Sequence, residues 1–199
     1  IILLPLIGFL ISCSLSFFKS NKFIDRAAEI TTSLFITITA IFSFYIFIDN
    51  IGDPSIVSIK LFNWISSGSF NADWSIYLDT ATRVMLVVIT SVSALVHIYS
   101  IGYMSHDDSK PRFMGYLSLF TFAMLMLVTA DNFLQLFFGW EGVGLASYLL
   151  IGFWYKKPTA NAAAIKAFIV NRIGDFGLAL GIFTIFIVFG SIEYQTVFN

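Results

Sequence analysis

Long runs of apolar residues, separated by short polar segments, dominate the hydropathy pattern of this chain of 199 residues. Each run has about 17 to 29 residues, enough at 1.5 Å per residue for a helix to cross a hydrocarbon core of about 30 Å. Membrane β-strands would be about ten residues long and would alternate in polarity, which these runs do not. The pattern predicts an all-α membrane protein, a single membrane domain over residues 1–199 with about six transmembrane helices. The predicted helices are residues 1–18, 27–48, 80–104, 113–129, 132–154 and 162–190.

The first run resembles a secretory signal peptide in its apolar character. It lacks a positively charged start and a clear cleavage site, so we interpret residues 1–18 as a spanning helix at the start of a trimmed chain. Cys13 lies within this run; as a single cysteine it excludes a disulfide within the chain, and we expect it to serve packing.

Basic residues gather in alternate loops. The loops after the first, third and fifth predicted helices contain Lys19, Lys22, Arg26, Lys110, Arg112, Lys156 and Lys157. The opposite loops and their edges contain one basic residue and six acidic ones, namely Lys60, Asp49, Asp53, Asp73, Asp79, Asp131 and Glu193. Because cytoplasmic loops carry the excess of Lys and Arg, this alternation predicts six crossings with the N-terminus outside.

The longest loop, residues 49–79, lies on the predicted outer side. Within it, residues 55–64 and 69–78 alternate between polar and apolar positions, and a Ser-Ser-Gly turn separates them. This pattern predicts a short β-hairpin, with a disordered loop as the alternative. Its aromatic residues are suited to the boundary between membrane and water. These residues are Trp64, Trp74 and Tyr77.

Composition agrees with a membrane protein. Hydrophobic residues make up 58% of the chain, charged residues 12%, and the mean hydropathy is +0.87. Soluble domains have about 25% charged residues, and one soluble core could not hide so much apolar surface, so lipid is the expected surrounding. A net charge of −1 without a basic run argues against a nucleic-acid partner.

A few charged residues fall inside the predicted helices. Arg83 is near the start of its helix, so we expect it to extend outward to water. Glu141 lies about 14 Å into the fifth helix, and Arg172 and Asp175 lie about 15 and 20 Å into the sixth. A charge at such depth costs about 3 kcal/mol or more, and such residues usually face the bundle interior and mark ion pathways.

Glu141 is the strongest candidate for proton transfer. Its neighbours are apolar or small, so desolvation favours the neutral carboxyl group, whereas a nearby cation favours the carboxylate. A carboxyl group balanced between these effects can take up and release a proton as its partner moves. The alternative is a permanently protonated Glu141 that is hydrogen-bonded to a helix backbone.

Three residues of the sixth helix and one of the third are further candidates for a role in proton transfer. Arg172 and Asp175 are three residues apart and could form an ion pair, with a functional or a purely structural role. Lys166 could anchor the helix at the inner surface or extend across to the fifth helix. In the third helix, His97 could relay protons near neutral pH or simply be a hydrogen-bonded histidine.

Small residues in the fifth and sixth helices would permit close packing. They are Gly139, Gly142, Gly144, Ser147, Gly174, Gly177 and Gly181. No pair of His or Cys residues has ligand spacing, and no glycine-rich loop follows a strand. The sequence therefore gives no support for a haem, iron–sulfur, zinc, NADH or ATP site.

Two runs carry a family resemblance. DNFLQLFFGWEGVGLASYLLIGFW, at residues 131–154, and AAAIKAFIVNRIGDFGLALGIF, at residues 162–183, resemble chain 5 (subunit L in bacteria) of the proton-pumping NADH–quinone oxidoreductase, respiratory complex I. LVHIYSIGYM and PRFMGYLSLFTFAMLMLVTADN extend the similarity toward the N-terminus. Subunits of multisubunit sodium/proton antiporters share the Trp-Glu pair but usually not both runs.

The resemblance implies a function for the charged residues. In that family the glutamate of helix five, here Glu141, belongs to a proton path and pairs with a lysine on helix seven. Lys166, Arg172 and Asp175 match positions that matter for function or subunit contact. NADH, FMN, iron–sulfur clusters and quinone would be bound by partner subunits rather than by this chain, in a bacterial or mitochondrial inner membrane. The implied fold has inverted five-helix repeats with a broken helix in each, and its partners are the other membrane subunits.

Because the chain ends at Asn199, before a seventh helix, we expect an N-terminal fragment that does not pump alone. Three hypotheses follow: a proton-translocating subunit of complex I, a subunit of a sodium/proton antiporter, and a structural membrane scaffold whose buried charges only pack.

Overall fold

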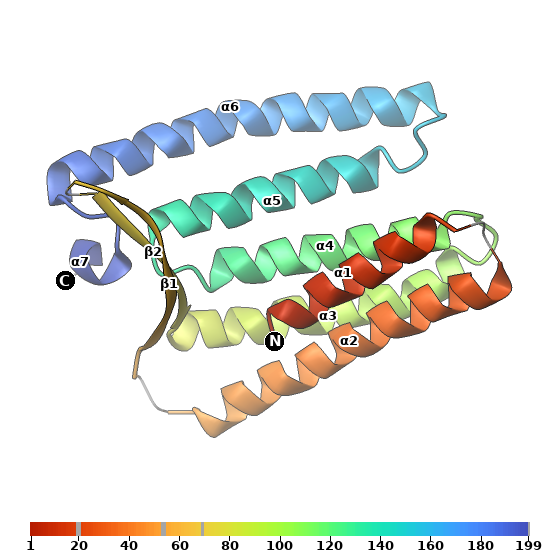
Figure 1. Cartoon of the computed structure of the whole chain (residues 1–199), viewed down its shortest axis with the longest axis horizontal. Coiled ribbons are helices and arrows are strands. Elements are labelled where there is room, and N and C mark those ends of the chain that lie inside the picture. The colour runs from red at the N-terminus through yellow and green to blue at the C-terminus, as the bar shows by residue number, and fades with distance from the viewer. Residues whose placement is uncertain (19–20, 53–54, 69, 199) are drawn as a thin grey trace.

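The computed structural model describes residues 1–18, 21–52, 55–68 and 70–198, so Lys19, Asp53 and Asn199 lie outside the described residues. Six long rods of helix run side by side, and a two-stranded sheet and a short helix lie at one end of them (Figure 1). The helices are α1 (Leu3–Ser16), α2 (Lys22–Asp49), α3 (Thr80–Tyr103), α4 (Lys110–Val128), α5 (Phe133–Ile151), α6 (Pro158–Phe189) and α7 (Tyr194–Phe198). The strands are β1 (Val57–Ser67) and β2 (Phe70–Leu78).

The predicted fold class is confirmed, with one difference at the N-terminus. Within the described residues, five helices (α2 to α6) are long and apolar enough to cross a membrane. The remaining predicted span, residues 1–18, is shorter than expected: α1 has 14 residues, about 21 Å at 1.5 Å per residue. Serine hydroxyls near its end bond backward to the backbone, Ser14 to the carbonyl of Leu10 and Ser16 to that of Cys13. The predicted span reached Phe18 because it was drawn from apolarity alone, whereas the helix ends at Ser16.

Three helices begin earlier than predicted. α2, α4 and α6 start at Lys22, Lys110 and Pro158 rather than at residues 27, 113 and 162. The prediction placed charged residues and prolines in loops. Proline is favoured in the first helical turn, where its missing N–H would have no partner, and both α4 and α6 have proline there.

The connections of the bundle divide into two ends. The α1–α2, α3–α4 and α5–α6 connections lie together at one end, which we name the basic end, and the sheet lies at the other, the hairpin end (Figure 1). The basic end contains Lys22, Arg26, Lys110, Arg112, Lys156 and Lys157. The segregation agrees with the predicted topology, in which the basic end faces the cytoplasmic side.

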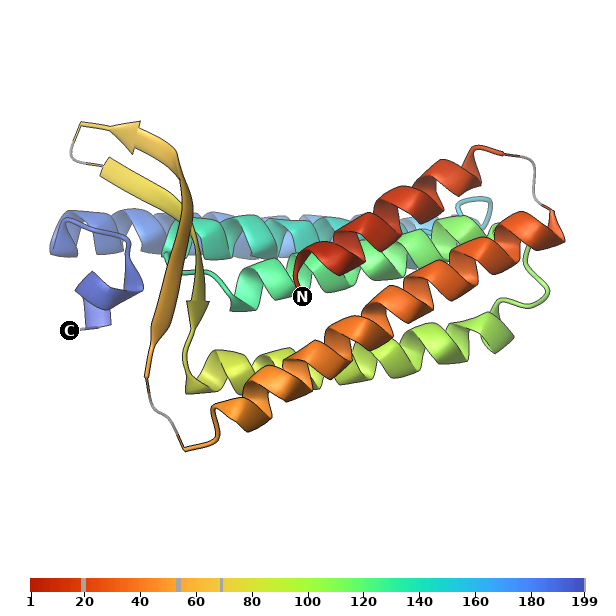
Figure 2. The same cartoon turned by 60° about the horizontal axis from the view of Figure 1, so that its bottom comes forward.

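The predicted β-hairpin is confirmed. β1 and β2 pair antiparallel, from Val57 opposite Leu78 to Ser67 opposite Phe70, with two irregularities in the register. The hairpin stands across the ends of the helices rather than continuing their direction (Figure 2). It therefore covers the hairpin end of the bundle.

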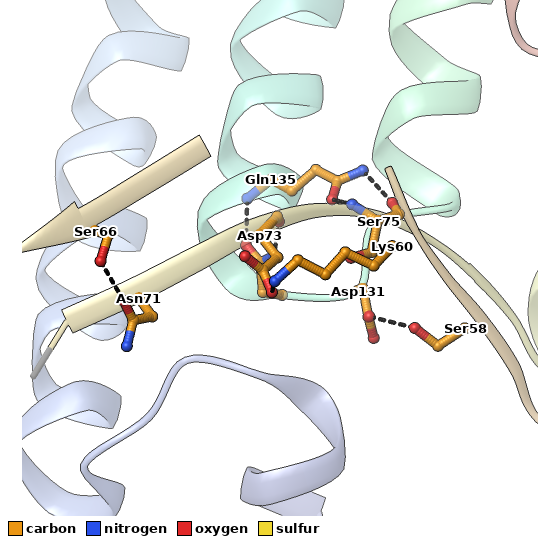
Figure 3. A network of polar contacts seen from close by, with 9 residues as sticks. Ser58, Lys60, Ser66, Asn71, Asp73, Ser75, Asp131 and Gln135 are labelled. Carbon is orange, nitrogen blue, oxygen red and sulfur yellow. Dashed lines mark hydrogen bonds and ion pairs between the residues drawn. The ribbon is translucent and has the colours of Figure 1, made fainter. Parts of the chain in front are cut away.

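Polar contacts fasten the hairpin to the start of α5 (Figure 3). The side chain of Gln135, which is fully buried, accepts a bond from the Ser75 N–H at 3.1 Å and donates to the Ser75 carbonyl at 2.8 Å. Asn132 caps α5 by accepting from the Gln135 N–H at 2.8 Å and donates to the Asp73 carbonyl at 2.7 Å. Lys60 of β1 pairs with the Asp73 carboxylate across the hairpin. The Gln135 amide thus bonds both backbone groups of Ser75, as a neighbouring strand would do in a wider sheet.

Close packing joins α5 to α4 rather than to α6. A Cβ atom added to Gly139 would lie 2.6 Å from the backbone of Leu127, and one added to Gly142 would lie 3.0 Å from the Ala123 Cβ. The glycines of α6 have a different environment: apart from the adjacent residues and backbone of α6 itself, no atom of the described chain lies within 4 Å of a Cβ added to Gly174, Gly177 or Gly181. The small residues of α5 and those of α6 therefore do not form one shared interface.

Arg83 corrects a sequence-based expectation. Its residue is only 3% exposed, so it does not extend into water. Its guanidinium group donates to the Ser55 carbonyl at 2.8 Å, in the segment that leads into β1. A backbone acceptor from the long loop takes the place of water as its partner.

Candidate functional site

An ion pair joins the middle of α5 to the middle of α6. The Nη1 atom of Arg172 lies 2.6 Å from both Glu141 oxygens, Oε1 and Oε2. Glu141 is about 12 Å along α5 and Arg172 about 21 Å along α6, so neither is near the end of its helix. The Glu141 side chain is 24% exposed and that of Arg172 is 51% exposed along the uncovered face of α6. Glu141 lies close to its predicted place along the helix, whereas Arg172 lies about one turn further along than predicted because α6 begins at Pro158.

Asp175 is the second carboxylate beside the same arginine. Its Oδ2 atom lies 3.7 Å from Nη1 of Arg172, which is the predicted pairing of residues three apart. The Arg172 guanidinium group is therefore closer to Glu141 on the neighbouring helix than to Asp175 on its own helix. Asp175 is also the more buried acid, with 9% of its side chain exposed.

Trp140 completes the cluster. Its indole Nε1 donates to Oδ1 of Asp175 at 2.8 Å, so the two Asp175 oxygens have different partners. Sequence reasoning did not select Trp140, although a usable signal existed. A tryptophan N–H in an apolar environment needs an acceptor, and Trp140 directly precedes the acidic residue of α5.

The charges of the cluster do not balance. Two carboxylates, Glu141 and Asp175, share one guanidinium group, and the Phe168 ring packs 4.9 Å from the Arg172 Cζ atom. If both acids are ionised, one negative charge remains without a cation among the described neighbours. A single proton would neutralise it. The arrangement is therefore chemically suited to hold one exchangeable proton.

Lys166 and His97 lie apart from this cluster. Lys166 is exposed on α6, about 12 Å from the start of the helix, and has no ion-pair partner in the part of the chain that the structure describes. The structure therefore does not bring Lys166 to Glu141. His97 belongs to α3, which packs mainly against α2 and α4 rather than against the two helices that contain the ion pair.

His97 is buried in a polar contact between α3 and α4. It is 1% exposed, with Nδ1 2.8 Å from the Ser93 carbonyl and Nε2 3.1 Å from the Ser118 hydroxyl. The Ser93 hydroxyl in turn lies 2.6 Å from that of Thr121. Both ring nitrogens thus have partners, as the simpler of the two sequence interpretations expects.

Comparisons with known proteins identify the family. Residues 64–114 match the family model described as NADH-Ubiquinone oxidoreductase (complex I), chain 5 N-terminus. Residues 130–199 match the one described as NADH:quinone oxidoreductase/Mrp antiporter, TM. NADH-quinone oxidoreductase subunit L of Rickettsia felis is 56% identical over 89% of this chain and 28% of its own length. NADH-ubiquinone oxidoreductase chain 5 of Chondrus crispus is 52% identical over the whole of this chain and 29% of its own length. The chain thus spans less than a third of these relatives.

Solved structures share the fold. The Mrp complex from Dietzia sp. has a chain that aligns with a TM-score of 0.76 and 22% identity, over 98% of this chain and 20% of that one. The membrane-bound sulfane sulfur reductase, an archaeal respiratory membrane complex, has one that aligns with a TM-score of 0.80 and 16% identity, over 98% and 38%. The two family models and the relatives above identify the family: this multi-pass membrane protein belongs to the antiporter-like membrane subunits that include chain 5, or subunit L, of NADH–quinone oxidoreductase.

Proposed function

We propose that this chain is the N-terminal part of a proton-translocating subunit of an NADH–quinone oxidoreductase. The observation that carries the proposal is the cluster of Glu141, Arg172 and Asp175, in which two acids share one cation halfway along two membrane helices. Relatives that align with the chain over most of its length have the names of such subunits in bacteria and in Chondrus crispus.

Glu141 is the proton-carrying group in this proposal. While the Arg172 guanidinium group is 2.6 Å away, its charge compensates the carboxylate and opposes protonation. When the guanidinium group withdraws, the carboxylate in an apolar bundle takes up a proton. Return of Arg172 expels the proton. Movement of one side chain thus couples a conformational change to proton transfer.

Lys166 and His97 have supporting roles in the proposal. Lys166 places a positive charge on α6 between the basic end and the ion pair, where it can influence the direction from which a proton approaches. His97, with partners on both nitrogens, can pass a proton only by exchanging hydrogen bonds with Ser118 or with the Ser93 carbonyl. Both roles are secondary to that of Glu141.

Redox chemistry belongs to partner subunits in this proposal. Across the described part of the chain, no three His, Cys, Asp or Glu side chains lie close enough together to hold a metal ion. NADH, FMN, iron–sulfur clusters and quinone would be bound elsewhere in the complex, and this subunit would use the free energy passed to it through neighbouring membrane subunits.

The test is Glu141→Gln in the full-length subunit within the assembled complex. We expect fewer protons to be pumped per NADH oxidised, because the amide cannot take up a proton at Glu141. Glu193→Gln is the matched control, since it makes the same chemical change in the segment between α6 and α7 at the hairpin end. Glu141→Asp should retain more pumping than Glu141→Ala, because it keeps an ionisable group. Unchanged proton stoichiometry in Glu141→Gln would favour the structural scaffold.

A sodium/proton antiporter subunit is the second candidate function. The family model that matches residues 130–199 includes Mrp antiporters in its description, and a chain of the Mrp complex has the same fold. Replacing sodium by potassium in the assay distinguishes the two. Proton transport that continues without sodium and requires NADH oxidation supports the first candidate, whereas transport that stops without sodium supports the second.

A further inference from the structure

The contact between Trp140 and Asp175 is not used by the proposed mechanism. Asp175 accepts from the indole N–H at Oδ1, at 2.8 Å, and faces Arg172 with Oδ2, at 3.7 Å. We propose that Trp140 is a positioning residue for the Glu141–Arg172 pair: it holds Asp175 and so leaves the guanidinium group to Glu141. This inference rests on the proposed function, because it concerns the same ion pair.

The two carboxylates compete for one nitrogen atom. Nη1 of Arg172 is the atom nearest to both acids, at 2.6 Å from Glu141 and 3.7 Å from Asp175. At equal dielectric, attraction between unit charges at the shorter distance is about 1.4 times that at the longer one. Because the same nitrogen faces both carboxylates, a guanidinium group drawn toward Asp175 would compensate Glu141 less fully. The position of Asp175 therefore controls how well Glu141 is compensated.

An indole N–H is well suited to hold Asp175 in place. Asp175 has only 9% of its side chain exposed, so a lost donor would not be replaced freely by water. The indole donates, does not accept and does not change its protonation near neutral pH. It stabilises one oxygen of the carboxylate without adding a charge that could itself attract Glu141. Residues 140 and 141 are adjacent on α5, so one helix presents both the proton carrier and the group that restrains its competitor.

Among the described residues, the other titratable groups nearest the pair on its own helices are Lys166 of α6 and Tyr148 of α5, whose ring packs against Phe168. The charged groups that contact Glu141 or its partner are Arg172 and Asp175 of α6. α4 and β2 also pack against α5. Their titratable residues lie toward the ends of α5, with Lys110, Arg112 and Tyr116 at the basic end and Asp73 and Tyr77 at the hairpin end. A change in the titration of Glu141 on altering Trp140 would therefore be transmitted through Asp175 and Arg172.

The test is Trp140→Phe in the full-length subunit of the assembled complex. Without the indole N–H, Asp175 turns toward Arg172, and Glu141 takes up its proton at a higher pH. We expect the pH profile of proton pumping to move to higher pH than in the wild type. The infrared band of the protonated Glu141 carboxyl group, identified by its loss in Glu141→Gln, should move over the same pH range.

Two controls separate positioning from general disturbance. In a Trp140→Phe/Asp175→Asn double variant no charged competitor remains, so its profile should coincide with that of Asp175→Asn alone. Trp154→Phe removes an equivalent indole bond, from Trp154 Nε1 to Asp107 Oδ2 at 3.0 Å near the basic end, and should leave the profile unchanged. If Trp140→Phe does not assemble, Trp140→Gln and Trp140→Met provide the comparison. Glutamine keeps an N–H donor and should preserve the profile, whereas methionine should shift it.

The proposal is overturned if Trp140→Phe leaves both the pumping profile and the infrared titration unchanged. It is also overturned if the shift is equally large with Asp175→Asn present, because the effect would then not pass through Asp175. Failure of the proposed function gives a different result. Normal pumping by Glu141→Gln would remove the transport role of Glu141, while the infrared titration would still report whether Trp140 governs its protonation.

Discussion

Gly139→Ala should destabilise the contact between α4 and α5. The added Cβ atom would lie 2.6 Å from both Cα and N of Leu127 and 2.8 Å from its Cβ. Ordinary contact begins at 3.4 Å, so the helices would have to separate by about 0.8 Å. The obstacle is backbone, which cannot rotate away as the end of a long side chain can. Helix pairs in membranes depend on such close approach between small residues.

The size of the effect follows from two opposing contributions. Overpacking a close contact costs about 1–3 kcal/mol, whereas alanine is favoured over glycine within a helix by about 1 kcal/mol. At the upper end of the packing cost, a net loss of about 2 kcal/mol remains, roughly a 30-fold change in the folding equilibrium. Because α5 lies between α4 and α6 (Figure 1), its displacement would also press Glu141 toward Arg172. We therefore expect reduced proton pumping alongside reduced stability.

The assay is thermal unfolding of the full-length subunit in detergent, compared across three glycine variants. Gly142→Ala should cost less than Gly139→Ala, because its new atom would meet the Ala123 methyl group at 3.0 Å rather than backbone. Gly102→Ala is the control, since nothing among the described residues lies within 4 Å of the added atom, and it should be neutral or stabilising. Equal stability of Gly139→Ala and Gly102→Ala would refute the close approach of α5 to Leu127.

Two further predictions concern the hairpin end. Gln135→Leu should weaken the hairpin by about 1–3 kcal/mol, because it leaves the buried N–H and carbonyl of Ser75 without partners; faster amide hydrogen exchange in β2, absent in Ser66→Ala, would show this. Burial and the nearby Asp131 carboxylate raise the pKa of Tyr194, so the unfolded chain loses this proton first and folding stability should fall as the pH rises above about 10. Asp131→Asn should lower the pKa of Tyr194, visible as tyrosinate absorbance that appears at a lower pH than in the wild type and is lost in Tyr194→Phe; absorbance unchanged by Asp131→Asn would contradict this.

Hydropathy predicted the helices well, because the length and apolar character of a membrane span follow simple rules in lipid. Glu141 and Arg172 stand out from sequence because few apolar helices contain a charge at such depth. The starts of α4 and α6 were missed because the charged and proline residues there were assigned to loops. Local polarity at the edge of an apolar run does not determine whether the backbone is helical.

The pairing across helices could not be predicted, because it depends on the rotation and height of one helix against another. Spacing along α6 identified Arg172 and Asp175 as neighbours, yet the shortest contacts of Arg172 are to Glu141. Glycine spacing indicated that α5 and α6 could pack closely but not with which neighbour, and Gly139 faces Leu127 of α4. Periodicity gives the faces of a helix without stating which neighbour each face will meet.

In the proposed function, one helix pair has to contain both a stable ion pair and an exchangeable proton, and the two acids beside Arg172 offer a way to combine them. With one acid, Arg172 would form a neutral pair that has little reason to bind a proton. With two acids at equal distances, Arg172 would divide its contacts between them. Here Asp175 has a second donor in Trp140 and the longer distance to Arg172, so the two acids are unequal and the arginine remains with Glu141. A modest force on α6 relative to α5 would reverse that preference, because the distances that decide it differ by only about 1 Å.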